Sequence, residues 1–402
     1  MTMNTELFRK LQNFRASLNT SFLERTEVVD GVLASILTKQ NAFLFGAPGT
    51  GKSELVREIS NGFSGSKFFG YLLSPTTDPS ELFGPVAVSK LLKDEYVRDV
   101  EGYLPDSNIA FLDELFRGSS AVLNSLLTIL NERTFNNGRH VITTPVQSIV
   151  AATNSFPQEE SLQAFCDRFL FRPTVDCLKL PASKATLDSW AVGVQERPSI
   201  QSELTFEDLI ELQQEVERVK INDQFLDSFR QTLELLEARG LTVSDRRRVQ
   251  ILKFMRGWAL VQGNDELRAE YLHGSLVHIV YRNVDDINVI KECLNQAVPT
   301  ADMVLTSIKR ASHGIETEFH ALMSVTRERR GVVQDLQGLN ETVSKLRRLH
   351  KNSQTLSKKI DGILDSDEYQ MSAEERLSAS KLSQAIEDRT NSIAKTINDL
   401  SA

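Results

Sequence analysis

The stretch "NAFLFGAPGTGKS", residues 41–53, decides the fold. Its first half is a short apolar run ending in Gly46, which is typical of a strand buried on both faces of a parallel sheet. Its second half fits the pattern G-x-x-x-x-G-K-[ST], and a helical pattern begins at Glu54. A strand, a glycine-rich loop and a helix in this order predict a phosphate-binding loop.

The chemistry of this loop follows from its composition. Glycines let several backbone N–H groups point at one phosphate, and the helix N-terminus adds partial positive charge. We expect Lys52 to reach the β- and γ-phosphates of a nucleotide and the Ser53 hydroxyl to ligate Mg²⁺. The alternative is a glycine-rich turn with an incidental lysine, which the strand–loop–helix context disfavours. The predicted nucleotide-binding residues are Gly46, Ala47, Pro48, Gly49, Thr50, Gly51, Lys52, Ser53 and Glu54.

Three further apolar runs, at 67–74, 109–114 and 148–155, also predict buried strands. Helical patterns separate them, and residues 5–40 themselves predict helices. Strands alternating with helices indicate a parallel sheet covered on both faces, so we expect an α/β fold of the αβα sandwich type.

Two adjacent carboxylates, Asp113 and Glu114, end the run "IAFLDE". On its own this pattern favours an ordinary strand end at the surface. Ligands of parallel sheets bind at the carboxyl ends of the strands. If 41–46 and 109–114 lie side by side, Asp113 reaches the metal held by Ser53 and Glu114 activates a water against the γ-phosphate.

Asn154 ends the run "AATN" in the same manner. Its side chain could hydrogen-bond the γ-phosphate or the attacking water at the same edge of the sheet. The equally weighted alternative is a turn-forming asparagine, because asparagine and serine both favour turns.

Arginines outside the loop are candidates for stabilising charge in phosphoryl transfer. In "FCDRFLFRP", Arg168 and Arg172 lie four residues apart, and a neighbouring subunit could supply such an arginine. The alternative is a solvated ion pair with Asp167 or Glu160.

"SDRRR" places Arg246 near the start of a helix that Ser244 or Asp245 caps. Three arginines in the first turn of a helix are unfavourable by its dipole, so we expect an anionic neighbour for at least one of them. Plain surface charge is the alternative.

The loops between the strands contain further patterns. Residues 79–83 predict a short helix, and 85–92 with 95–100 predict a hairpin. Residues 133–142 predict a second hairpin with a two-residue turn at Asn137-Gly138. Residues 115–131 predict a helix that leads from the two carboxylates into this hairpin.

The C-terminal part of the chain is helical. Apolar stripes recur through 182–298, and glycine and proline nearly vanish from 299 onward. A heptad seam over 332–346, a capping box at Ser372 and Glu375, and a second seam after it predict two or three antiparallel helices. They form either a structural bundle or a module that docks a partner.

Composition limits the functional classes. The chain has 402 residues and ordinary globular composition. Its net charge of −8 disfavours a dominant nucleic-acid-binding surface. Its three cysteines follow no metal-ligand pattern and indicate reduced thiols. No stretch resembles a signal peptide or a membrane span, so we expect a cytoplasmic protein with no membrane contact.

Taken in order, the chain resembles AAA+ ATPases of the MoxR family. The resemblance rests on "GAPGTGKS", "IAFLDELFRGSSAVLNSLLTILNERTFNNG", "AATNS" and "DRFLFRP". It is closest to the RavA-like branch in "SFLERTEVVDGVLASILTKQNAFLFG" and "GLTVSDRRRVQILKFMRGWALVQG", and it covers roughly residues 1–260.

The resemblance implies roles for the residues that match the motifs of the family. Lys52 and Ser53 match Walker A, whereas Asp113 and Glu114 match Walker B. The family pattern also implies that 79–105 is the helix-2 insert and that 133–142 is the pre-sensor-1 hairpin, loops that face the ring pore in related proteins.

Three further roles carry over in the same way. Asn154 matches sensor 1, Arg168 the arginine finger and Arg246 the sensor 2 arginine, for which Arg247 is the second choice. The implied catalytic residues are thus Lys52, Glu114, Asn154, Arg168 and Arg246, and the implied metal ligands are Ser53 and Asp113.

The change of pattern after Pro181 and the loss of glycine and proline from 299 onward predict three domains. These are an AAA+ nucleotide-binding domain (1–181), an all-α lid (182–298) and a C-terminal helical, coiled-coil-like domain (299–402). The resemblance implies a hexameric ring that hydrolyses ATP to ADP with Mg²⁺ and remodels a protein, often beside a von Willebrand factor A (vWA) partner. RavA-like chains carry a strand-rich insertion that this sequence lacks, so the partners specific to that branch are not expected here.

Two other functions compete with this prediction. A nucleic-acid motor, such as a helicase or translocase, could use the same core, but the acidic charge and the lack of interleaved basic and aromatic residues disfavour it. A nucleotide-gated scaffold would not need the water-activating Glu114.

Overall fold

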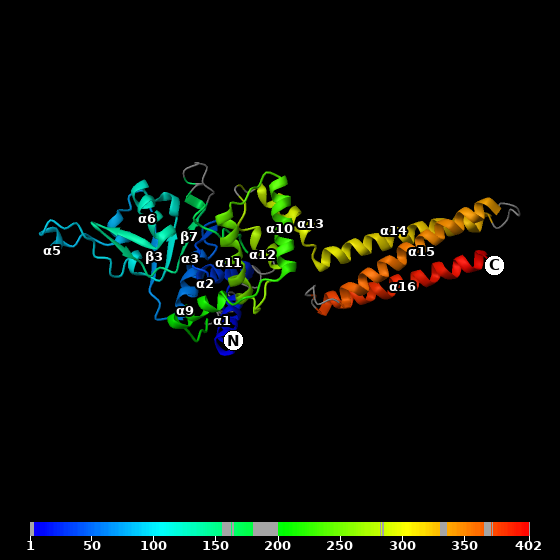
Figure 1. The fold of residues 1–402 in the computed structure, drawn as a ribbon, viewed down its shortest axis with the longest axis horizontal. Coiled ribbons are helices and arrows are strands. Elements are labelled where there is room, and N and C mark those ends of the chain that lie inside the picture. Colours follow the sequence, from blue (N-terminus) through cyan, green and yellow to red (C-terminus); the bar gives the residue numbers. More distant parts are fainter. Residues whose placement is uncertain are drawn as a thin grey trace, which may run out of the picture. The chain divides into compact units, whose positions relative to one another are not determined.

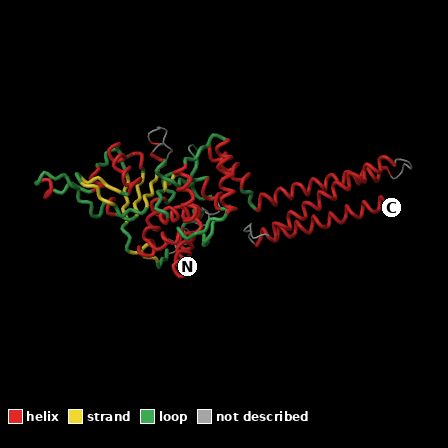
Figure 2. The backbone as a smooth tube through the Cα atoms, in the orientation of Figure 1, coloured by secondary structure: helices red, strands yellow, loops and turns green. Residues whose placement is uncertain are grey.

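The computed structural model of the protein describes residues 4–154, 162, 165–179, 200–281, 283, 285–329, 336–365, 371 and 373–401. The chain divides into two compact units, Met1–Ala297 and Val298–Ala402, and each is described by itself. All described strands belong to the first unit (Figure 2).

A four-stranded parallel sheet forms the centre of the first unit, as the sequence predicts. The strand order is β1-β7-β4-β3, and Phe171 and Thr174 bridge the free side of β1 in parallel. The expectation that 41–46 and 109–114 are neighbours is wrong, because β7 lies between them. The strands are β1 (Ala42–Phe45), β3 (Phe68–Leu72), β4 (Ile109–Asp113) and β7 (Ser148–Thr153).

Strand β3 differs from the other three in burial. Residues 67–74 were expected to form a buried strand, but β3 is the sheet edge and Leu72 is 64% exposed. Strands β1 and β7 are buried throughout, and β4 is buried up to Asp113. An apolar run alone does not distinguish an edge strand from a central one.

Helices cover this sheet, and helices α1 and α2 confirm the prediction for residues 5–40 (Figure 1). Helix α1 buries Leu7, Leu11, Phe14 and Leu18, whose spacing places them on one face. Helices α2 and α3 contact the sheet. The bounds of these helices are α1 (Thr5–Ser21), α2 (Thr26–Leu37), α3 (Lys52–Asn61) and α6 (Ser120–Glu132).

The part of the first unit after residue 200 is mainly helical. A two-residue strand, β8 (Leu204–Thr205), pairs in parallel with β2 (Phe63–Ser64). The predicted boundary between core and lid at 181–182 lies outside the described residues and stays a prediction. The helices are α9 (Phe206–Val216), α10 (Asp223–Ala238), α11 (Asp245–Val261), α12 (Tyr271–Leu276) and α13 (Asp286–Ala297).

The insert contains less strand than expected. Val86 and Arg98 form an isolated antiparallel bridge, but residues 88–91 are helical, so the hairpin predicted over 85–92 and 95–100 is wrong beyond this bridge. The predicted short helix is present. The helical elements of the insert are α4 (Pro79–Phe83), α5 (Val88–Leu91) and the 3₁₀ turn η1 (Leu104–Asp106).

The second predicted hairpin is confirmed as β5 (Thr134–Asn137) and β6 (His140–Thr143). Its turn lies one residue later than expected, because Asn137 pairs with His140 and leaves Gly138 and Arg139 as the turn. Gly138 has φ +66°, which glycine adopts without strain.

The helix expected over 115–131 is interrupted. Leu115–Arg117 form a 3₁₀ turn (η2), and α6 begins only at Ser120, where the Ser119 side chain caps it. Gly118 separates the two elements, and a Cβ there would come 2.6 Å from the Leu73 side chain. A side chain at position 118 would therefore clash with the chain after β3.

The second unit confirms the predicted antiparallel helices (Figure 1). One apolar cluster contains residues 301–308 of the first helix, 360–363 of the second and 379–386 of the third. The other cluster contains Ile315, Leu346, Leu349 and Ile393, further along the first and third helices and earlier in the second. Val332 and Ser372, which entered the prediction, lie outside the described residues. The helices are α14 (Ala301–Arg329), α15 (Leu336–Asp365) and α16 (Ala373–Ser401).

None of the described helices is both long and apolar enough to cross a membrane. The three cysteines, Cys166, Cys177 and Cys293, are free thiols.

Candidate functional site

The loop between β1 and α3 has the geometry of an anion site. Gly49 and Gly51 have φ +79° and +81°, and a Cβ at either would meet nothing within 4 Å, so the backbone conformation rather than packing favours glycine. Gly51 is the N-cap of α3, and no side chain caps the helix. The first N–H groups of a helix have no intrahelical acceptor, so they can bind phosphate oxygens.

Lys52 lies under this loop and is only 6% exposed. Its Nζ donates to the carbonyl oxygens of Gly46 at 2.6 Å and Ala47 at 2.9 Å. Burial lowers the pKa of Lys52, and the carboxylates of Asp113 and Glu114 act in the opposite direction. The ammonium group is therefore positioned beside the phosphate-binding backbone and near two compensating acids.

Ser53 and Asp113 come together as expected, although their strands are not neighbours. The Ser53 Oγ donates to Asp113 Oδ2 at 3.0 Å, and the backbone N–H of Glu114 donates to Asp113 Oδ1 at 3.0 Å. A hydroxyl and a carboxylate oxygen directed at one point are ligands that Mg²⁺ accepts. The two residues therefore fit the metal that the phosphate loop implies.

The order of the strands brings Asn154 and Glu114 into contact. Because β7 lies beside β4, the Asn154 Nδ2 donates to Glu114 Oε1. Glu114 has φ +53°, in the left-handed region that non-glycine residues adopt uncommonly. Arg117 forms an ion pair with the same carboxylate at 3.5 Å, a partner that sequence reasoning missed. Its position three residues after Glu114 was the available signal.

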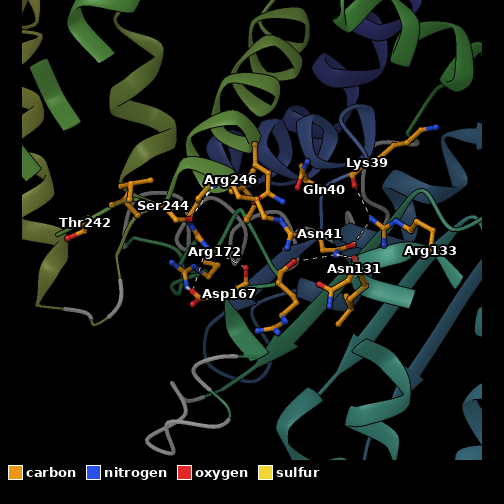
Figure 3. Close-up of a pocket in the computed structure, with 17 residues that line it drawn as sticks. Lys39, Gln40, Asn41, Asn131, Arg133, Asp167, Arg172, Thr242, Ser244 and Arg246 are labelled. Carbon is orange, nitrogen blue, oxygen red and sulfur yellow. Dashed lines mark hydrogen bonds and ion pairs between the residues drawn. The ribbon is translucent and has the colours of Figure 1, made fainter. Parts of the chain in front are cut away.

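Arg168 and Arg246 lie elsewhere, at a pocket of about 550 Å³ (Figure 3). Residues 39–41 also line this pocket, and they precede β1, whereas the phosphate loop follows β1. The structure therefore brings the two arginines together at the amino end of β1, the opposite end from Lys52.

Arg246 and Arg247 have different surroundings. Arg246 is exposed and lines the pocket. Arg247 pairs with Asp167 at 3.5 Å and donates to the Ile279 carbonyl oxygen at 2.6 Å, which confirms an anionic neighbour for one of the three arginines. Of the two predicted capping residues, Ser244 and Asp245, Ser244 caps the helix.

For Arg172 the ion-pair alternative is confirmed, with Asp167 at 3.6 Å. The guanidinium is only 3% exposed, however, so the expectation of a solvated pair is wrong. It also donates to the carbonyl oxygens of Ile279 and Tyr281. Glu160, the other expected partner, lies outside the described residues.

Comparisons with known proteins agree with this geometry. The profile described as "MoxR domain in the MoxR-vWA-beta-propeller ternary systems" matches residues 9–214. The uncharacterised protein MJ0079 of Methanocaldococcus jannaschii is 33% identical over 291 residues, which are 72% of this chain and 75% of the relative. Protein MJ0812 of the same organism is 35% identical over 277 residues, 69% of this chain and 72% of the relative.

Among solved structures, a candidate ATPase from Cytophaga hutchinsonii superposes with a TM-score of 0.60. The match covers 73% of this chain and 96% of that chain, at 17% sequence identity. At this identity the likeness shows the shared fold.

Proposed function

Because this chain belongs to the MoxR family of AAA+ ATPases, we propose that it hydrolyses ATP to ADP and phosphate and uses the energy to remodel a protein partner. The observation that carries the proposal is the convergence of Lys52, Ser53, Asp113, Glu114 and Asn154 at the carboxyl edge of one sheet. Within the family, the two RavA-like stretches favour that branch.

Each residue has a role that its geometry supports. The phosphate loop and Lys52 bind the β- and γ-phosphates, and Ser53 and Asp113 would hold Mg²⁺, which would supply positive charge beside the phosphates. Glu114 takes a proton from a water that attacks the γ-phosphorus, while the bond to the β-phosphate oxygen breaks and ADP leaves. Asn154, which donates to Glu114 Oε1, helps to orient this carboxylate.

The positions of Arg168 and Arg246 support a ring. Both lie at the opposite end of β1 from the chain's own phosphate loop, so a neighbouring subunit's nucleotide is the one they can serve. We propose a hexamer in which the two arginines stabilise the transition state on that nucleotide. The family profile belongs to MoxR–vWA systems, which supports a vWA protein as partner.

The exposed loops of the insert and hairpin favour a protein as the remodelled substrate. Apolar side chains there could contact an unfolded polypeptide. The exposed apolar residues are Val88, Leu91, Leu92, Tyr96 and Val141.

ATP turnover by the full chain tests the enzymatic part. Lys52→Ala should lose ATP binding, and Glu114→Gln should bind ATP but lose turnover by roughly a hundredfold or more. Glu237→Gln, which alters an exposed carboxylate on α10, is the matched control and should behave as wild type. Normal hydrolysis by Glu114→Gln would refute the assignment.

Two binding measurements test the remodelling part. Light scattering with and without ATP should show assembly, and pull-down of a vWA protein should depend on residues 299–402. Unchanged recovery without that segment would exclude it as the docking module. Strong, ATP-coupled and salt-dependent DNA binding would favour the nucleic-acid motor instead.

A further inference from the structure

Arg168 and Arg246 line the same pocket, and the residues next to them in the chain form an ion pair. Asp167 precedes Arg168, Arg247 follows Arg246, and the Arg247 guanidinium lies 3.5 Å from the Asp167 carboxylate. The same guanidinium also donates to the Asp167 backbone carbonyl at 3.4 Å. This contact connects the turn that carries Arg168 to the helix that carries Arg246.

Arg172 strengthens the connection. Its guanidinium lies 3.6 Å from Asp167 and 2.9 Å from the Ile279 carbonyl oxygen, so it shares both acceptors with Arg247. The Arg172 side chain also stacks on the Tyr281 ring at 4.9 Å, and the Tyr281 hydroxyl donates back to the Arg172 carbonyl at 2.7 Å. We call Asp167, Arg172, Arg247 and the Ile279 carbonyl the arginine clasp.

The clasp has one negative side chain for two guanidinium groups. Two cations that converge on the same acceptors repel each other, and Asp167 is the group that compensates this repulsion. Arg172 is buried and has several further partners, whereas Arg247 is 14% exposed. Loss of the Asp167 charge would therefore displace Arg247 rather than Arg172.

The backbone of Arg168 is fixed on its other side by Asn41, at the amino end of β1. The Asn41 Nδ2 donates to the Arg168 carbonyl at 3.3 Å, and the N–H of Leu170 donates to the Asn41 carbonyl at 2.9 Å (Figure 3). The turn thus has a rigid support in the sheet. A change in the distance between the backbones of Arg168 and Arg246 therefore involves α11 and the clasp.

From this arrangement we propose that the clasp is a positioning device that sets the spacing of Arg168 and Arg246, so that both reach one phosphate group on a neighbouring subunit. The inference rests on the proposed ATPase function. Arg247, Arg172 and Asp167 act through the two pocket arginines and do not touch the nucleotide.

Steady-state kinetics of the full chain test the proposal. Arg247→Gln and Asp167→Asn should each lower kcat about tenfold and leave the KM for ATP within about twofold, because displaced arginines weaken the transition state and not nucleotide binding. The control is Arg239→Gln, which removes an exposed ion pair with Glu292 of α13. We expect this variant to have the kcat of the wild type.

A double-mutant comparison separates positioning from general structural damage. In an Arg168→Ala/Arg246→Ala background, Arg247→Gln should change the remaining turnover by less than about twofold, because nothing is left to position. An equal tenfold loss in both backgrounds would overturn the proposal, as would wild-type kcat for both clasp variants. If Arg247→Gln does not fold, Asp167→Asn at its exposed site decides alone.

The outcomes distinguish this inference from the proposed function. The proposed ATPase function is supported if Lys52→Ala abolishes hydrolysis and Arg168→Ala weakens it. This result does not depend on the clasp variants. Absence of hydrolysis in the wild-type chain refutes both.

Discussion

The side chain of Asn137 forms two hydrogen bonds with the main chain of Arg98. It accepts from the Arg98 N–H at 2.6 Å and donates to the Arg98 carbonyl at 2.9 Å. Asn137 ends β5, and Arg98 lies in the insert, so these hydrogen bonds join the hairpin to the insert. Helix α6 precedes β5 directly, and the Glu114 strand end precedes α6.

Removal of this side chain should loosen the insert. Asn137→Ala leaves the two main-chain groups of Arg98 without these partners, which should cost about 1–3 kcal/mol of unfolding free energy. Hydrogen exchange at the Arg98 amide should become faster. Asn136→Ala, at an exposed position of the same strand, is the control. Equal exchange in both variants would show that the contact does not join the loops.

Gly138 should tolerate no side chain. A Cβ there would lie 1.8 Å from the Tyr96 carbonyl oxygen, in addition to the strain of its positive φ. Gly102 has a similar φ of +78°, but nothing lies within 4 Å of its Cβ position. Gly102→Ala should therefore cost about 1 kcal/mol from backbone strain alone, and Gly138→Ala clearly more, as measured by urea unfolding. Equal losses would show that the Tyr96 carbonyl does not restrict position 138 sterically.

The pairing of Ser53 with Asp113 predicts a specific magnesium defect. Ser53→Ala should raise the Mg²⁺ concentration for half-maximal ATP turnover by about tenfold or more, because one ligand oxygen is lost. Ser125→Ala removes a partly exposed hydroxyl on α6 that bonds only the Ala121 carbonyl among the contacts described, and it should leave the requirement unchanged. An unaltered requirement in Ser53→Ala would remove Ser53 from the metal site.

The sequence predicted local elements well where they depend on local patterns. The four strands, the phosphate loop and the hairpin at 133–142 all follow from apolar runs and turn residues. The prediction was wrong where neighbours in space decide the structure. The exposure of β3 depends on its place at the sheet edge, and the strand order places β7 between β1 and β4.

The same distinction holds for the site. Asp113 and Glu114 were placed at the phosphate loop from a wrong strand pairing, and the prediction of their proximity held because all carboxyl ends of a parallel sheet share one edge. The arginine clasp could not be predicted in full. The Ile279 carbonyl that both guanidinium groups share is a main-chain atom far along the chain, and no side-chain pattern marks it.

The described part of the second unit has an odd number of antiparallel helices. The first and last residues of the bundle therefore lie at opposite ends. The chain enters the bundle at Ala301 and reaches Ser401 at the opposite end. At 1.5 Å per residue, a helix the length of α16 spans about 44 Å. Energy transfer between fluorophores attached at these two ends would therefore measure the length of the bundle. It would report unfolding of the bundle separately from that of the first unit.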